Sequence, residues 1–263
     1  MNSFLATLAH PGVSLQQPFD VAVVMPTILR PQIADALTSI FAQDFPGRIQ
    51  VLVGIDVPLG DMAIFDRICA TRRPANCVVQ LLQPGYSTSA RHGGLCEARD
   101  GGVLRTVLSH LANSRLVAYL DDDNWWHPAH LRLLAAAIQD RDYAFAPRWF
   151  VHPTTKRIVA RDDWESVGLG RGVYDGLYGG CIDPNCLMID KIRSAEILPL
   201  WMIPQPGDEK AMSADRTVFM RLAADFQGVG TPDPTVYYRL DPTDDMHVER
   251  MKVMAAAYAA AGG

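Results

Sequence analysis

The chain has 263 residues, a formal net charge of −5, 49% hydrophobic residues and 20% charged residues. This composition supports a sizeable hydrophobic core and argues against an intrinsically disordered protein. The acidic balance argues against nonspecific nucleic-acid binding, which depends on a surplus of lysine and arginine. The length suits one large α/β domain, or one domain with a modest extension.

The first half of the sequence alternates predicted strands and helices. After a loosely attached lead-in over residues 1–19, a continuous apolar run at 21–25 indicates a parallel strand that is covered on both faces. The next predicted elements are, in order, a helix over 31–43, strands over 50–55 and 78–82, a broken helix over 87–113 and a strand over 116–120. This alternation predicts an α/β fold with a doubly wound, mainly parallel sheet flanked by helices.

The second half predicts a small antiparallel addition to that sheet. Strand patterns over 143–151 and 157–159 surround a turn, and the Gly- and Asp-rich stretch over 161–184 predicts a functional loop. The remaining predicted elements are a strand over 185–189, a helix over 213–226, a strand over 235–240 and a helical tail from Met246. We find no internal repeat and no low-complexity linker, so we expect one domain over residues 1–263.

The cysteines and the N-terminus predict a cytoplasmic protein. The five cysteines are odd in number and scattered, and only Cys181 and Cys186 lie close together, so no zinc site is completed. We expect reduced, mostly buried thiols. No secretory signal is recognisable, and no apolar run approaches the ~20 residues that span a bilayer. Peripheral association of the protein with a membrane is an open alternative.

Three consecutive carboxylates, Asp121, Asp122 and Asp123, directly follow the predicted strand at 116–120. Their mutual repulsion is best relieved by a cation, and Mg²⁺ and Mn²⁺ prefer carboxylate oxygens and share their coordination with substrate phosphates. The carboxyl ends of strands are also where open α/β sheets bind ligands. A solvated acidic turn, or the N-cap of a helix that starts near Pro128, is the alternative.

Polar residues follow two further predicted strands, Pro26-Thr27 after the first and Asp56 after the second. Right-handed crossovers bring the carboxyl ends of parallel strands to one edge, so these residues should converge on the aspartates. Asp56 could instead cap a helix or form a turn.

A polar segment over 85–94 opens the next predicted helix with hydroxyl groups, small residues and Arg91, which can pair with a phosphate. The same start also caps a helix without any ligand. Neither a P-loop nor a GxGxxG fingerprint is present, which argues against nucleotide hydrolysis and dinucleotide redox chemistry.

In this order, the motifs resemble the family 2 glycosyltransferases of GT-A fold. They are Pro-Thr at 26–27, Gly-Ile-Asp at 54–56, Ser-Ala-Arg-His-Gly-Gly at 89–94, Leu-Asp-Asp-Asp-Asn-Trp at 120–125 and Ala-Asp-Arg at 214–216, which resembles the family's Glu-Asp motif. The resemblance covers about residues 20–240, and the aspartate-rich motif is its most specific part. It implies a nucleotide-sugar-binding half over 21–125, an acceptor-side half over 126–240 and a C-terminal tail helix over 241–263.

The resemblance implies a metal-dependent, inverting transfer of a sugar from a nucleotide-diphospho-sugar, most simply a UDP-sugar, to an acceptor hydroxyl. Asp56 would read the base edge and Arg91 would lie near the nucleotide and its phosphates. The rest of the expected nucleotide-binding set is Pro26, Thr27, Asp121 and Asp122, although Asp122 should point more toward the scaffold.

The resemblance also implies the metal and the catalytic base. Asp121 and Asp123 match the outer positions of the DxD motif, and Asp123 would bind Mn²⁺ or Mg²⁺ directly. Asp215 would deprotonate the acceptor hydroxyl. Ala214 stands where the family usually has Glu, and the upstream acids Asp208 and Glu209 could substitute for it. Asp215 could instead be the N-cap of the helix over 213–226.

Weaker candidates complete the predicted site. One of Trp125 and Trp126 could stack on a sugar, although tryptophan is equally a core residue. His247 could supply a metal ligand or simply be a solvated side chain. Arg239 could meet a phosphate or form a surface ion pair. Gly180 belongs to a glycine-rich stretch over 168–184 that could close over the acceptor or merely form turns.

Two other functions stay open at this point. A nucleotidyltransferase of related fold would need a Gly-rich, basic loop after the first strand, where this chain has Pro-Thr-Ile-Leu-Arg at 26–30. A catalytically silent sugar-nucleotide or glycan-binding module is suggested only by Ala214. The acceptor could be a glycan, a lipid-linked molecule or a small molecule, and no nucleic-acid partner is expected.

Overall fold

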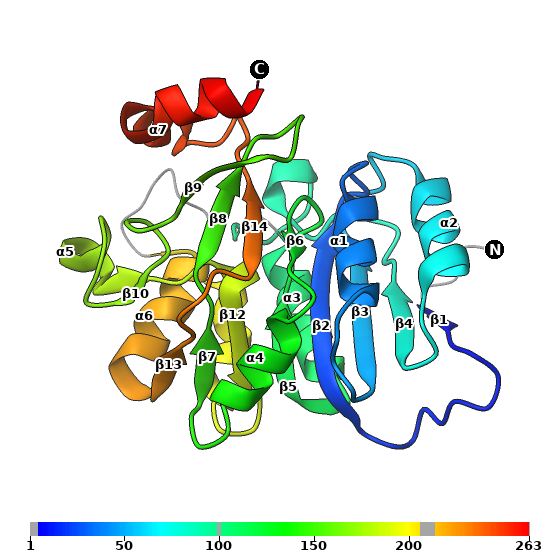
Figure 1. Cartoon of the computed structure of the whole chain (residues 1–263). Coiled ribbons are helices and arrows are strands. Elements are labelled where there is room, and N and C mark those ends of the chain that lie inside the picture. Colours follow the sequence, from blue (N-terminus) through cyan, green and yellow to red (C-terminus); the bar gives the residue numbers. More distant parts are fainter. Residues whose placement is uncertain (1–4, 99–100, 206–213, 263) are drawn as a thin grey trace.

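An eight-stranded sheet forms the centre of the molecule in a computed structural model that describes residues 5–98, 101–205 and 214–262 (Figure 1). Its parallel core consists of β4 (Cys77–Leu82), β3 (Ile49–Ile55), β2 (Phe19–Thr27) and β5 (Ser114–Tyr119). Every residue of β3 is buried, as its unbroken apolar run predicts for a strand covered on both faces. The predicted α/β class and mainly parallel sheet are confirmed.

Antiparallel strands extend this core on both sides. β1 (Leu5–Leu8) pairs with β4, so part of the predicted lead-in is an edge strand. On the other side, β12 (Leu187–Asp190) lies antiparallel between β5 and β7 (Tyr143–Phe145), and β13 (Gly228–Gly230) runs parallel to β7. Backbone pairing across distant parts of the chain creates these edges, which local patterns do not reveal.

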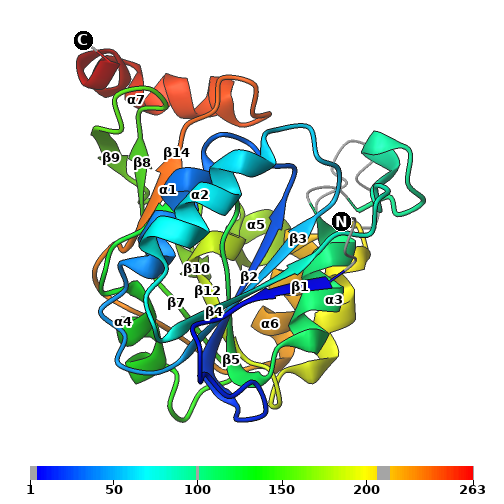
Figure 2. The same ribbon diagram turned by 90° about the vertical axis from the view of Figure 1, so that its right-hand side faces the viewer.

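Helices cover both faces of the sheet (Figure 2). One face carries α1 (Ile33–Phe41) and α2 (Met62–Arg72), and the other carries α3 (Gly102–Leu111), the 3₁₀ segment Ala195–Met202 and α6 (Asp215–Asp225). The shorter α4 (His130–Ala137) packs against β7. Gly54 of β3 lets α3 approach closely, since a Cβ there would lie 3.0 Å from Leu108 and 3.1 Å from Leu104.

The helix predicted over 87–113 is wrong in its first part. Over the described residues 87–98 the helical structure is limited to a 3₁₀ turn over Ala90–His92, and α3 begins at Gly102. The Ser89 hydroxyl accepts a hydrogen bond from the Arg91 amide, a local bond that competes with helix formation. Gly93 follows with a φ of 89°, which ends the turn.

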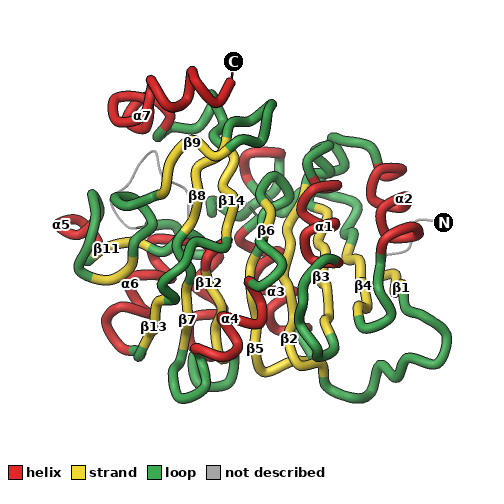
Figure 3. Tube along the Cα trace, viewed as in Figure 1, coloured by secondary structure: helices red, strands yellow, loops and turns green. Residues whose placement is uncertain are grey.

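A second, four-stranded sheet stands above the carboxyl ends of the central strands (Figure 3). Its strands are, in order, β6 (Trp125–Trp126), β14 (Val236–Arg239), β8 (Arg148–Val151) and β9 (Ile158–Arg161), and all neighbours except β14 and β8 are antiparallel. The strand predicted over 143–151 divides between the two sheets because Pro147, which lacks an amide hydrogen, separates β7 from β8.

The predicted functional loop over 161–184 contains β10 (Gly168–Leu169), α5 (Asp175–Tyr178), β11 (Gly180–Cys181) and the start of a 3₁₀ turn over Pro184–Cys186. The predicted tail helix is α7 (His247–Gly262), which packs on β9. Four of the five free thiols are buried, and that of Cys96 is half-buried. Within the described part of the chain, no helix has the length and apolar character needed to cross a membrane.

Candidate active site

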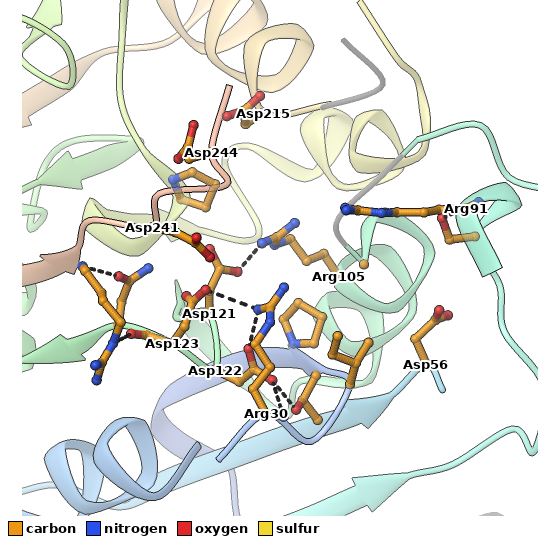
Figure 4. Close-up of a pocket in the computed structure, with 18 of the residues that line it drawn as sticks. Arg30, Asp56, Arg91, Arg105, Asp121, Asp122, Asp123, Asp215, Asp241 and Asp244 are labelled. Atoms are coloured by element: carbon orange, nitrogen blue, oxygen red, sulfur yellow. Dashed lines mark hydrogen bonds and ion pairs between the residues drawn. The ribbon is translucent and has the colours of Figure 1, made fainter. Parts of the chain in front are cut away.

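A cavity of about 670 Å³ lies at the carboxyl ends of β2, β3 and β5, beneath the second sheet (Figure 4). Nine of its lining residues are aspartates and four are arginines. The predicted site residues that line it are Pro26, Thr27, Asp56, Arg91, Asp121, Asp122, Asp123, Asp215 and Arg239. The convergence expected from right-handed crossovers is therefore present in the fold.

Asp122 is the most deeply buried of the three consecutive aspartates, with 1% of its surface exposed. Its carboxylate accepts hydrogen bonds from the Thr27 hydroxyl at 2.6 Å and from the Arg30 guanidinium at 2.7 Å. The Arg30 amide donates to the same carboxylate at 3.3 Å. Asp122 thus ties the loop after β2 to the loop after β5, as expected for a side chain directed toward the scaffold.

Asp121 is held by residues from two other elements. One carboxylate oxygen pairs with the guanidinium of Arg105 on α3, and the other accepts a hydrogen bond from the Asn185 amide group at 2.9 Å. Arg105 itself is only 5% exposed and lies over the Trp201 ring, 5.4 Å from its centroid. A buried arginine so oriented fixes Asp121 and adds positive charge to the cavity wall.

Asp123 has fewer partners than its two neighbours. Its carboxylate lies 3.2 Å from the Arg30 guanidinium, and 29% of its side chain is exposed to the cavity. Its deep position and the charges of Asp121 and Asp122 raise the pKa of Asp123 to about 7, against the opposing effect of Arg30. Removal of the carboxylate from water is the main cause of this shift, and the two neighbouring carboxylates add to it.

The loop after β2 adopts a strained conformation that places Arg30 over the aspartates. Leu29 is buried and has a φ of 63°, which a non-glycine residue adopts at a cost of about 1–3 kcal/mol. Its amide donates to the Thr27 hydroxyl at 2.7 Å, and Thr27 in turn donates to Asp122. The same turn therefore fixes the carboxylate and its guanidinium partner.

Asp56 follows β3 and is buried, at 5% exposure. It accepts hydrogen bonds from the Ser87 hydroxyl at 2.6 Å and from the Thr88 amide and hydroxyl at 2.7 and 2.6 Å. Asp56 thereby fixes the loop after β4, which carries Arg91 and His92 along the same end of the cavity. Figure 4 shows Asp56 and Arg91 on one side of the aspartate cluster, with Asp215 and Asp244 on another.

Asp215 is the first residue of α6 and lines the cavity opposite Asp56. Ala214 takes the N-cap position without a side-chain hydrogen bond, while the Asp215 carboxylate accepts one from the Arg216 amide at 2.8 Å. A carboxylate in the first turn is also favoured by the helix dipole. The two acids considered as substitutes for the missing Glu, Asp208 and Glu209, lie outside the described residues.

Arg239 at the end of β14 faces the cavity but is occupied by protein partners. Its guanidinium donates to Asp35 at 2.9 Å and to the Asp123 carbonyl at 3.1 Å, and it also contacts the Pro153 carbonyl. With 10% of its side chain exposed, Arg239 joins the two sheets and fits the predicted ion pair better than a phosphate ligand.

Four weaker candidates do not line this cavity, as far as the chain is described. Trp125 stacks on Tyr237 with centroids 5.5 Å apart, and Trp126 is buried and donates to the Asn185 carbonyl at 2.8 Å. Trp126 thus ties β6 to the 3₁₀ turn over Pro184–Cys186, whereas Trp125 packs on β14 within the second sheet.

His247 and Gly180, the other two candidates outside the cavity lining, each contact other parts of the protein. His247 begins α7, where its ring lies 6.0 Å from that of Tyr258. Gly180 pairs with Leu169 and has a φ of 110°, and a Cβ there would overlap the Gly168 carbonyl oxygen. Gly180 is therefore needed for the close approach of β10 and β11.

Sequence reasoning overlooked several lining residues. Arg30 and Arg105 balance the aspartate cluster, and Asp241, Asp244 and Asp245 line the cavity just after β14. The three aspartates follow a predicted strand, so the strand-end rule that identified Asp56 could have identified them. No local signal indicates that a helix such as α3 presents a buried arginine.

The donor set fits a divalent cation held together with a ligand. Among the described residues, no three His, Cys, Asp or Glu side chains already surround one point. However, Mg²⁺ and Mn²⁺ at phosphate sites commonly use only one or two carboxylates and take their other oxygens from substrate and water. Asp123 and Asp121 can supply such oxygens, and they belong to three consecutive carboxylates whose repulsion a cation would relieve.

No protein-family model matches the sequence, and no curated protein matches it. Among solved structures, TarS 1-349 of S. aureus aligns with a TM-score of 0.60 at 15% identity, over 84% of this chain and 60% of that one. The same protein in complex with UDP-GlcNAc gives 0.59 at 16% identity, over 90% and 66%. The mannosyltransferase PcManGT from Pyrobaculum calidifontis, in complex with GDP-Man and Mn²⁺, gives 0.55 at 16% identity, over 90% and 61%.

The chain therefore spans about 60% of the length of the first of these structures. At such low identities the likeness establishes the fold and not the activity. The chain has the GT-A fold of these glycosyltransferases, as the sequence resemblance implied.

Proposed function

We propose that this protein is a metal-dependent, inverting glycosyltransferase that uses a nucleotide-diphospho-sugar. The observation that supports the proposal most strongly is that Asp56 and Arg91, the three consecutive aspartates and Asp215 all line one cavity. That cavity is polar and lies at the carboxyl ends of parallel strands, where α/β folds bind nucleotides. The proposal further places the donor half at 21–125, the acceptor half at 126–240 and the enzyme in the cytoplasm.

The donor nucleotide would occupy the end of the cavity near Asp56 and Arg91. Arg91 would pair with a phosphate, and Asp56 would read the edge of the base beside the loop that it fixes. UDP is the favoured nucleotide from the motif resemblance. Solved structures of the same fold include one in complex with UDP-GlcNAc and one with GDP-Man, so the base is the first property to measure.

The diphosphate would lie over Asp121 and Asp123. A Mn²⁺ or Mg²⁺ ion held by Asp123, with Asp121, would supply positive charge to stabilise the departing diphosphate. Arg30 and Arg105 would add positive charge around it, Arg30 with 42% of its side chain exposed and Arg105 with 6%. Asp122 would keep the loop after β2 in place.

Asp215 would act as the general base at the far side of the cavity. It would take the proton of an acceptor hydroxyl, whose oxygen would form a bond to the anomeric carbon while the bond from that carbon to the diphosphate breaks. Attack from the face opposite the diphosphate inverts the anomeric configuration. Ala214 provides no second carboxylate, so Asp215 would act without the acid that the family usually places beside it.

The test is to incubate the protein with Mn²⁺, a set of UDP- and GDP-sugars and a panel of acceptors, and to measure nucleotide release and the anomeric configuration of the product. Inverted product with release of nucleoside diphosphate supports the proposal. Release of pyrophosphate would instead identify a nucleotidyltransferase, and tight nucleotide binding with an intact donor would identify a silent binding module.

A further inference from the structure

A second, inner pocket of about 190 Å³ adjoins the main cavity at Asp215. The two spaces share Asp183, Asp215, Tyr238 and Asp244 as lining residues. Figure 4 shows Asp215 and Asp244 close to each other and away from the end of the cavity that holds Asp56. A ligand in the inner pocket would therefore reach Asp215 from the side opposite the nucleotide.

The wall of the inner pocket is a network of buried ion pairs. The Arg148 side chain is 1% exposed and lies 2.8 Å from Asp162 and 2.7 Å from Asp183. The Arg250 side chain is 2% exposed and pairs with Glu165 at 2.7 Å and with Asp244 at 2.8 Å. Buried pairs of this kind hold their geometry, so the pocket is formed before any ligand arrives.

One polar group in this wall has bonding capacity to spare. Nη2 of Arg148 is buried and lies 3.1 Å from Glu165, but it donates no hydrogen bond of good geometry within the described part of the chain. Buried donors are normally satisfied, so an unused donor in a pocket wall suggests a ligand oxygen. The Tyr238 ring lies beside it, with its centroid 4.0 Å from the Arg148 guanidinium carbon.

The charges around the pocket favour a neutral ligand over an anion. Its wall holds the guanidinium groups of Arg148, Arg216 and Arg250, and the carboxylates facing or pairing with them are those of Asp162, Glu165, Asp183, Asp215 and Asp244. Five carboxylates thus oppose three guanidiniums. Burial is the main cause that raises the pKa of Asp183; Arg148 opposes it and the charge of Asp121 adds to it.

We propose that this inner pocket binds a single uncharged sugar ring of the acceptor, with the reacting hydroxyl directed at Asp215. The inference rests on the proposed function and adds the substrate class to it. The volume of about 190 Å³ suits one ring. Carboxylates accept from ring hydroxyls and Arg148 donates to a ring oxygen, whereas a carboxylate or phosphate on the ring would be repelled.

The first test compares matched ligands on the native protein in the presence of UDP and Mn²⁺. The probes are methyl glycosides of glucose, mannose and N-acetylglucosamine, together with methyl glucuronide and mannose 6-phosphate, and binding is followed by ligand-observed NMR. We expect at least one neutral glycoside to bind, and its anionic counterpart to bind tenfold more weakly or not at all. Equal or tighter binding of the anionic ligands, or no glycoside binding by protein that binds UDP, would overturn the inference.

The second test fills the pocket. Cys181 of β11 is buried and lines the pocket, so Cys181→Phe should occupy the space and Cys181→Ser should leave it open. We expect Cys181→Phe to weaken glycoside binding at least tenfold and both variants to bind UDP as the native protein does. Glycoside binding unchanged in Cys181→Phe contradicts the inference.

The two proposals fail in distinguishable ways. Loss of all UDP binding by native protein would count against the proposed function, while the comparison of neutral and anionic glycosides still decides the nature of the pocket. Should Cys181→Phe not fold, that comparison on the native protein is sufficient by itself.

Discussion

The main cavity and the inner pocket are both rich in charge, but they hold it differently. In the main cavity, the Asp121 and Asp123 side chains are 28% and 29% exposed and that of Arg30 is 42% exposed. In the inner pocket, Arg148 and Arg250 are 1% and 2% exposed and pair with several carboxylates each. The partly exposed side chains of the main cavity can therefore still bind a cation and a ligand, whereas the buried, paired side chains of the inner pocket mainly hold its wall in place.

The largest effect on stability should come from breaking that wall. Arg148→Met leaves Asp162, Asp183 and Glu165 buried without their shared counter-charge, which should cost about 3–5 kcal/mol of unfolding free energy. Denaturant unfolding followed by tryptophan fluorescence measures it. The matched control is Arg161→Met, because Arg161 is an exposed arginine on the neighbouring strand β9. Equal stability of the two variants would show that the inner wall is not held by its ion pairs.

The largest effect on activity should come from Asp215→Asn, where the two spaces meet. Loss of a general base should reduce the rate of sugar transfer about 100- to 10,000-fold while nucleotide binding is unchanged. Asp225→Asn, at the exposed end of the same helix, is the control and should behave as the native protein. Full transfer activity in Asp215→Asn would exclude this residue as the base.

Arg30→Met should show whether Arg30 binds the diphosphate or only neutralises the neighbouring aspartates. A charge-assisted hydrogen bond to a phosphate contributes about 1.5–3 kcal/mol, so nucleotide diphosphate affinity should fall about tenfold or more. Calorimetric titration with UDP and Mn²⁺ measures the change, and the control is Arg132→Met, at an exposed arginine of α4 that pairs with Asp44. An unchanged dissociation constant would mean that Arg30 serves only to neutralise Asp122 and Asp123.

The smallest expected effect is on stability, at two glycines of α5 and β11. Gly180→Ala should destabilise the protein by more than ~1 kcal/mol, because its φ of 110° and the nearby Gly168 carbonyl leave no room for a Cβ. Gly176→Ala places a Cβ in open space and should be neutral or slightly stabilising. Thermal unfolding of the two variants decides. Equal melting temperatures would favour a mobile lid at Gly180 over the close β10–β11 pairing.

The donor side of the site was predictable because its residues follow buried strands. The apolar runs before Thr27, Asp56 and Asp121 set the strand ends, and the handedness of parallel crossovers then brings those ends together. Few other arrangements of these strands satisfy both conditions. Fold class and the aspartate cluster were therefore accessible from the sequence.

The rest depends on contacts between distant segments. Arg105 reaches Asp121 from within a helix, and Arg250 reaches Glu165 across 85 positions of the chain, without any periodic signal. Trp125 and Trp126 adjoin the motif in sequence, yet Trp125 stacks on Tyr237 of β14 and Trp126 is buried against Asn185. Closeness to the aspartate motif in sequence therefore does not predict which residues line the cavity when their contacts come from the second sheet.

The most direct test of the central claim is a calorimetric titration of UDP into the protein with Mn²⁺ and with a chelator. We expect native protein to bind UDP only when the cation is present. The surface control Asp163→Asn should behave in the same way, and Asp123→Asn should lose binding. UDP binding of equal strength with the chelator, or undiminished binding in Asp123→Asn, would contradict the assignment of the three aspartates to a cation-bound diphosphate.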